Sequence, residues 1–156
     1  LGYAPEFAGG TLDIGVAGTH IFSIKRQLTE GAREVEVAGL YASPVKWRLR
    51  GRMGWSKGGF SANGFVNHIG GYTNQLVTPA ERVSAWTTVD LTLAQAIGAG
   101  AGESGRGLNL ALSLVNLFDR DPPFAEIPSF SSALGYDPEK ANPLGRMISV
   151  QATIKW

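Results

Sequence analysis

The residue types that carry out chemistry are present in this sequence, but their spacing forms no recognisable catalytic or metal centre. His20 and His68 lie far apart without metal-ligand spacing, and the chain contains no Gly-x-Ser-x-Gly nucleophile motif. A serine acting with His68 and Asp90 on neighbouring strands is the hydrolytic alternative. The absence of cysteine excludes disulfides and thiolate metal sites. We therefore expect no enzymatic activity, no metal and no cofactor.

Two further patterns are similar to ligand sites when each is taken alone. Residues 100–105 match G-x-G-x-x-G, but a dinucleotide site needs a helix to begin there. Residues 108–114 instead alternate with the period of a strand, which favours a hairpin turn. Four acidic residues offer oxygen ligands for calcium: Asp119, Asp121, Asp137 and Glu139. They do not fall at EF-hand spacing, and two of them precede prolines that favour turns, so we predict a solvated loop.

One predicted strand, 45–55, carries a basic stripe that alternates with apolar residues. The stripe consists of Lys46, Arg48, Arg50 and Arg52. It has two interpretations: a surface for an acidic protein face or an anionic ligand, or the charged lining that any solvated interior needs. The chain as a whole has 14 basic and 13 acidic side chains, a balance that gives no case for a nucleic-acid partner.

The fold class follows from a two-residue period that recurs along the chain. Apolar and polar residues alternate in six segments, which we predict as strands: 11–26, 45–55, 60–72, 86–94, 107–116 and 147–156. The connections alternate between a short or glycine-rich kind (56–59, 97–106) and a long kind (27–44, 73–84, 118–144). We therefore predict an all-β, antiparallel meander with almost no helix.

The length and composition of the strands leave two environments open. Spans of about 9–11 residues with one apolar face suit strands that cross a bilayer at a tilt. No run of 18 apolar residues exists, so a transmembrane helix is excluded. Only 17% of the residues are charged, and 21 are glycine, which suits a β-rich chain with many turns. A soluble sandwich would show the same alternation, with its apolar face turned to a core.

The last forty residues distinguish these environments through a resemblance. NLFDRDPPF at 116–124 and GYDPEKANPLGR at 135–146, followed by an alternating strand to Trp156, resemble the C-terminus of TonB-dependent outer-membrane receptors. The upstream segments 43–74 and 86–93 are similar to barrel strands of that family. The residues that carry the signature are Asn116, Leu117, Phe118, Asp119, Pro122, Pro123, Tyr136, Asp137, Gly145 and Arg146.

The resemblance implies a fold and a function. The family has a barrel of about 22 strands with a plug domain and a TonB-contacting segment. Residues 1–156 are then expected to be a fragment, the C-terminal six strands of a transmembrane β-barrel, with plug and TonB box absent. The implied activity is import of a scarce nutrient, such as a siderophore, a vitamin or an oligosaccharide, across the bacterial outer membrane. The implied partners are membrane lipid, TonB through the missing part, and an unidentified small-molecule ligand.

The resemblance also implies an orientation and an assembly signal. If the C-terminus is periplasmic, the long connections all lie outside the cell and the basic stripe faces the lumen. The final strand is similar to the signal read by the barrel-assembly machinery, through Ile148, Val150, Ala152, Ile154 and Trp156. A terminal tryptophan also suits the membrane interface. The alternatives are a passive porin and a soluble β-barrel or sandwich binding protein.

Overall fold

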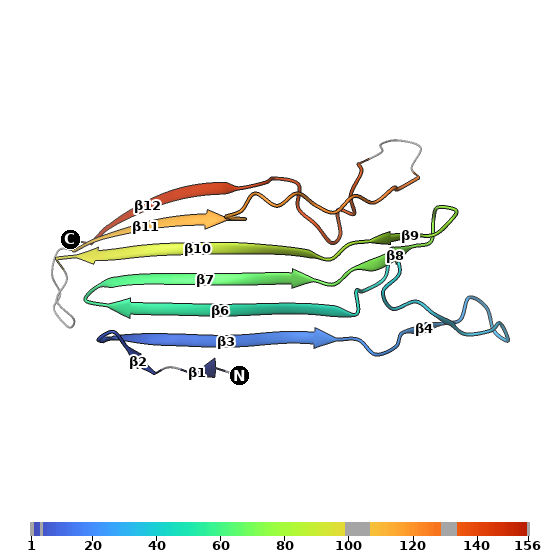
Figure 1. The fold of residues 1–156 in the computed structure, drawn as a ribbon, viewed down its shortest axis with the longest axis horizontal. Coiled ribbons are helices and arrows are strands. Elements are labelled where there is room, and N and C mark those ends of the chain that lie inside the picture. The colour runs from blue at the N-terminus through green and yellow to red at the C-terminus, as the bar shows by residue number, and fades with distance from the viewer. Residues whose placement is uncertain (1, 4, 99–106, 129–133, 156) are drawn as a thin grey trace.

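The protein is an antiparallel β-sheet that follows the order of the chain (Figure 1). The computed structural model describes residues 2–3, 5–98, 107–128 and 134–155, and these contain no helix able to span a membrane. Six long strands pair in sequence: β3 (Gly10–His20), β6 (Trp47–Lys57), β7 (Phe60–Ile69), β10 (Trp86–Ile97), β11 (Gly107–Val115) and β12 (Met147–Lys155). The predicted all-β class and antiparallel meander are confirmed.

Six short strands accompany the long ones in the described residues, and none of them was predicted as a separate strand. β1 (Gly2–Tyr3) and β2 (Glu6–Phe7) pair with β3, and two small hairpins form from β4 (Lys25–Arg26) with β5 (Val35–Glu36) and from β8 (Tyr72–Asn74) with β9 (Glu81–Val83). The predicted strands 11–26 and 60–72 are therefore too long. The second is interrupted at Gly70 and Gly71, where a Cβ would meet carbonyl oxygens of Trp47 and Val83 at 3.0 and 2.7 Å.

The register separates the two faces of the sheet. One row across all six strands is apolar or glycine: Ile14, Met53, Gly64, Leu91, Leu114 and Ile148. The neighbouring row points to the other face and is polar or glycine: Asp13, Gly54, Asn63, Thr92, Ser113 and Ser149. The rows alternate because successive side chains of a strand point to opposite faces.

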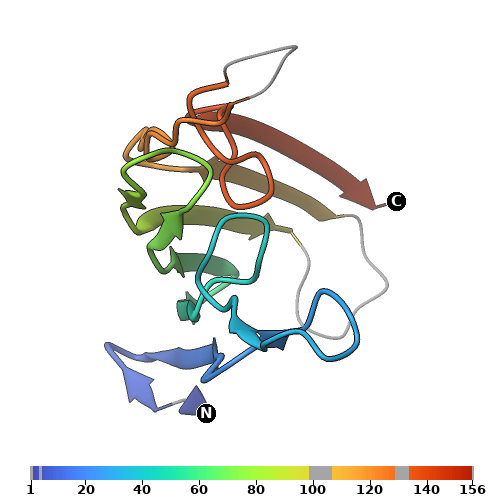
Figure 2. The ribbon, with the colours of Figure 1, turned by 90° about the vertical axis from the view of Figure 1, so that its right-hand side faces the viewer.

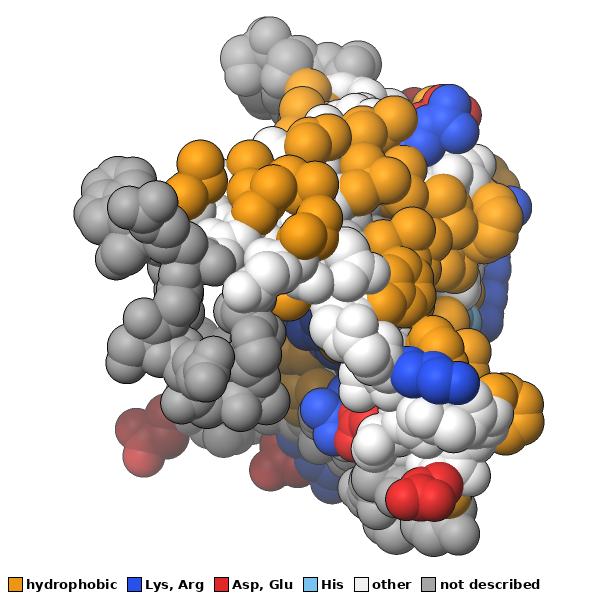
Figure 3. All heavy atoms as spheres, turned by 90° about the vertical axis from the view of Figure 1, so that its left-hand side faces the viewer, with side chains coloured by type: hydrophobic (Ala, Val, Ile, Leu, Met, Phe, Trp, Pro, Cys, Tyr) orange, Lys and Arg blue, Asp and Glu red, His pale blue; other side chains and the backbone are white. Residues whose placement is uncertain are grey.

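The sheet is curved, and its apolar face is convex. Figure 2 shows the strands following an arc, with parts of the long connections on its concave side. Figure 3 shows hydrophobic side chains gathered over the outer side of that arc. The sheet is not closed: among the described residues β12 pairs only with β11, and the other edge is formed by β3 with β1 and β2. The structure therefore shows a curved antiparallel sheet and not a complete barrel.

The short β6–β7 turn lies at one end of the sheet and the described parts of the three long connections lie at the other, as predicted (Figure 1). Gly58 and Gly59 join β6 to β7 with φ of 55° and 81°, the geometry of a two-residue type I′ hairpin. At the other end the described parts of the three long connections, 21–46, 70–85 and 116–146, pack on one another. Their small core consists of Val45, Tyr72, Val83 and Ala125, with Tyr41, Ile69 and Ile127 against it.

Candidate functional site

The concave face of the sheet carries a network of polar side chains. Asn67 donates a hydrogen bond to Asp90 at 2.8 Å, and the Thr92 and Ser113 hydroxyls lie 3.4 Å apart. These contacts join β7, β10 and β11 side by side. A face lined in this way suits contact with water.

The predicted basic stripe is divided by the structure. Arg48, Arg50 and Arg52 lie on the concave face of β6, in the register of Thr19, Ala17 and Gly15 on β3. Lys46 precedes β6, and its backbone carbonyl accepts a hydrogen bond from the amide of Ile21. Lys46 lines a separate recess that includes Glu36, Gly39 and Trp47. The stripe on this face therefore consists of three arginines.

These three arginines have different partners. Arg52 forms an ion pair with Asp13, with N–O distances of 3.1 Å to both carboxylate oxygens. Arg50 lies over the ring of Phe65, 4.5 Å from its centroid. Arg48 has no ion pair within the described residues. Only the guanidinium of Arg52 is therefore neutralised by a carboxylate in this part of the chain.

A recess of about 480 Å³ lies between this face and the third long connection. Its walls include Arg48, Arg50 and Asn67 from the sheet, together with Trp86 at the start of β10. Residues 138–142 supply the opposite wall. A second recess of about 440 Å³ shares Arg48, Glu139 and Lys140 with the first.

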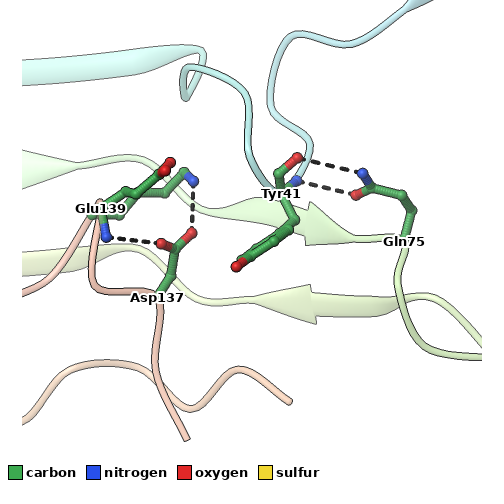
Figure 4. Close-up of polar contacts among 5 residues, drawn as sticks. Tyr41, Gln75, Asp137 and Glu139 are labelled. Carbon is green, nitrogen blue, oxygen red and sulfur yellow. Dashed lines mark hydrogen bonds and ion pairs between the residues drawn. The ribbon is translucent and has the colours of Figure 1, made fainter. Parts of the chain in front are cut away.

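The wall formed by residues 138–142 is anchored by a buried ion pair. Lys140 Nζ lies 2.6 Å from Asp137 Oδ2, and the two side chains are 7% and 2% exposed. The ammonium group also lies over the rings of Tyr72 and Tyr41, 4.6 and 5.5 Å from their centroids. Asp137 additionally accepts a hydrogen bond from the amide of Glu139 at 3.0 Å (Figure 4). The prediction of a solvated loop is therefore wrong for Asp137.

The two tyrosines come from the other long connections, so the cluster joins all three. The pKa of Tyr72 is raised well above its usual value, mainly by burial. The charge of Asp137 and a hydrogen bond from the tyrosine hydroxyl to that carboxylate raise it further. Burial and the same charge raise the pKa of Tyr41. The backbone amide of Tyr41 donates to the side-chain carbonyl of Gln75 at 3.1 Å (Figure 4). This cluster was not predicted; the sequence features that indicate it are two tyrosines and a Tyr-Asp-Pro-Glu-Lys run within the long connections.

The signature residues at the end of β11 form a turn that ties three strands together. The amide of Asn116 donates to Asp90 Oδ1 on β10 at 3.0 Å. Its side chain accepts from the Arg120 amide and donates to the Arg120 carbonyl, each at 3.0 Å. Asp119 accepts from the Arg146 amide at 2.7 Å, directly before β12. Gly145 has φ of 64°, and a Cβ there would lie 2.8 Å from the Asp119 carboxylate.

The other signature residues lie around this turn. The Leu117 amide donates to the carbonyl of Val89 at 2.7 Å and extends the pairing of β10 with β11. Phe118 is exposed, whereas Pro122, Pro123 and Tyr136 are half-buried. The structure therefore places the signature at the junction between the sheet and the third long connection.

The predicted assembly signal lies on the free edge of the sheet. Ile148, Val150, Ala152 and Ile154 all point to the convex face of β12, and the three larger side chains are 63–75% exposed. Trp156 lies outside the described residues.

The chemical groupings considered from sequence are not brought together. His68 points to the convex face, where its Nδ1 lies 2.8 Å from the Thr87 hydroxyl, whereas Asp90 points to the concave face. No group of three His, Asp or Glu residues in the described ranges is arranged to hold a metal ion. The Gly-x-Gly-x-x-Gly match at 100–105 lies outside the described residues.

Comparisons with known proteins assign no role to these residues. No family model, no curated protein and no solved structure matches this chain. A function for this chain is therefore inferred from its residues and their geometry.

Proposed function

We propose that this chain is part of the wall of a transmembrane β-barrel in the bacterial outer membrane. The barrel belongs to a TonB-dependent transporter that imports a scarce nutrient of the siderophore, vitamin or oligosaccharide type. The observation that carries the proposal is an uninterrupted apolar band on the convex face of the sheet.

The band extends across all six long strands. On the convex face, one row of paired residues contains His68 and another contains Lys57. Every convex residue of the six strands between these two rows is apolar or glycine. Several large members are strongly exposed, including Val16, Met53, Ile148 and Val150 at 60–75%. Soluble monomers rarely expose contiguous apolar patches of more than a few hundred Å². Contact with lipid accounts for such a face.

Aromatic residues mark both borders of the band on β6. Trp47 stacks on His20 at one border, with ring centroids 3.9 Å apart, and Trp55 lies 6.1 Å from Phe60 at the other. Trp55 lies eight positions after Trp47, which corresponds to about 26 Å along the strand. A tilt of about 40° reduces this height to about 20 Å, close to the roughly 25 Å band of outer-membrane barrels.

The open edges support a larger assembly. The outer edge of β12 has no partner strand in the described residues, and at the other edge only the short strands β1 and β2 pair with β3. Such incompletely paired edges are too costly in lipid, where each unsatisfied group costs several kcal/mol. In a membrane these edges therefore pair with further strands of the same barrel. The concave face, with its polar network, then lines a water-filled interior.

The resemblance at 116–124 and 135–146 supports the TonB-dependent class over a passive porin. In a receptor of that class TonB acts through a plug domain. The partners of this chain are then lipid, the barrel-assembly machinery and the remainder of the receptor.

Fractionation and crosslinking test the proposal. The complete protein is expressed in its host, and its membrane location, heat-modifiable migration and formaldehyde crosslinking to TonB are measured. An outer-membrane, heat-modifiable protein that crosslinks to TonB is expected. A heat-modifiable protein that swells sugar-loaded liposomes without crosslinking to TonB would indicate a porin. A stable monomer in plain buffer would indicate the soluble alternative.

A further inference from the structure

We propose that the 480 Å³ recess binds a small multivalent anion, a di- or tricarboxylate, through Arg48 and Arg50. The inference rests on the proposed function, because it takes the concave face as the water-filled side of a barrel wall. It adds a chemical class of ligand and names the two residues that recognise it.

Positively charged residues outnumber negatively charged ones around the recess. Arg48 and Arg50 have no carboxylate within 4.0 Å in the described part of the chain. The third cation, Lys140, is paired with Asp137. Glu139 is the remaining acidic residue of the lining. The lining therefore contains two arginines without a carboxylate partner and one glutamate, so the recess keeps a net positive charge.

The spacing of the two arginines selects the ligand. They are alternate residues on one face of β6, so their Cβ atoms are about 7 Å apart. A guanidinium binds a carboxylate through two parallel hydrogen bonds, and each arginine can hold one carboxylate in this way. A ligand with two or three carboxylates on a short carbon skeleton spans this distance and fits the recess.

The recess is also held in shape before a ligand binds. Arg50 is supported by the ring of Phe65, and the facing wall is fixed by the buried contact between Lys140 and Asp137. Preorganised groups lose less conformational freedom on binding, which favours affinity.

Calorimetry with citrate tests the inference on the complete protein purified in detergent at low salt. Wild type is expected to bind citrate and not the uncharged sorbitol. Arg48→Gln and Arg50→Gln should each weaken citrate binding about tenfold or more. Arg52→Gln is the matched control on the same face: it should weaken binding less than about threefold, because Arg52 is already paired with Asp13.

Two results would overturn the inference: no citrate binding by wild type, or equal losses in all three variants, which would indicate a diffuse positive field. Heat-modifiable migration establishes that each variant folds. Where a glutamine variant does not fold, lysine at the same position replaces it, because lysine retains the charge but lacks the two parallel donors of arginine. Citrate binding needs no TonB, so its outcome is separate from the transport proposal. If the protein binds citrate but does not crosslink to TonB, the anion site is supported and the transporter assignment is wrong.

Discussion

Asn116 and Asp119 hold the backbone in the left-handed region at the end of β11, with φ of 52° and 55°. Asn116→Ala is expected to lower the free energy of unfolding by about 3–4 kcal/mol. Alanine at positive φ costs about 1–2 kcal/mol, and each of the two lost side-chain bonds to Arg120 costs about 1 kcal/mol. The measurement is urea unfolding of the complete protein in phospholipid vesicles. Asn116→Gly keeps the backbone conformation, so a loss as large as that of alanine would contradict the role of φ.

Glu36, in the first long connection and outside the long strands, has a pH-dependent role. Hydrogen bonds from the Ser23 hydroxyl and from the amides of Ile24 and Ala38 lower its pKa to about 2. The pKa of Glu36 in the folded protein lies below the ordinary 4.5. The ionised carboxylate therefore stabilises the folded connection above pH 4.5, and this stabilisation is lost as the pH falls towards 2.

Hydrogen exchange measures this dependence. Protection of the Ile24 and Ala38 amides, corrected for intrinsic exchange, should fall between pH 4.5 and 2. Glu36→Gln cannot ionise, so its protection should be constant over the same range. A parallel fall in the variant would assign the effect to another carboxyl group.

Among the elements, the long connection 116–146 is anchored through Lys140. Lys140→Met leaves the buried Asp137 carboxylate without its cation, and breaking a buried pair costs about 3–5 kcal/mol. The loss should appear as faster hydrogen exchange over residues 134–146, with the long strands still protected. Lys25→Met breaks the exposed pair with Glu34 and should cost less than about 1 kcal/mol.

A double variant separates charge from packing in this cluster. Lys140→Met with Asp137→Leu removes both buried charges, and it should recover much of the protection that the single variant loses. Failure to recover any protection would show that the other contacts of the pair hold the connection: the tyrosine rings against the ammonium group and the hydrogen bonds to Asp137.

For the whole molecule, the two faces predict opposite tolerance to charge. Leu91 and Thr92 are neighbours on β10 and point to the convex and concave faces. In vesicles, Leu91→Arg is expected to reduce stability by about 2–4 kcal/mol, the cost of arginine at the bilayer midplane. Thr92→Arg should cost less than about 1 kcal/mol, because in the proposed barrel its charge enters a water-filled interior. Urea unfolding checks both, and equal costs would contradict a lipid-facing convex surface.

The sequence by itself determined the existence of the six long strands, the face to which residues within those strands point, and the glycine turn between β6 and β7. These features depend on neighbours along the chain. A strand reverses its side-chain direction at every residue, so the pattern in 45–55 or 147–156 is readable locally. The division of connections into short and long kinds followed from the same pattern.

Only the tertiary structure decided which charges are neutralised and where the strands end. Asp13 and Arg52 are 39 residues apart and meet only because β3 pairs with β6. Lys140 is buried because two other connections supply Tyr41 and Tyr72. β7 ends at Ile69, directly before Gly70, where the backbone of Trp47 comes close. A local pattern does not encode these contacts, since each depends on segments that come together only when the sheet curves.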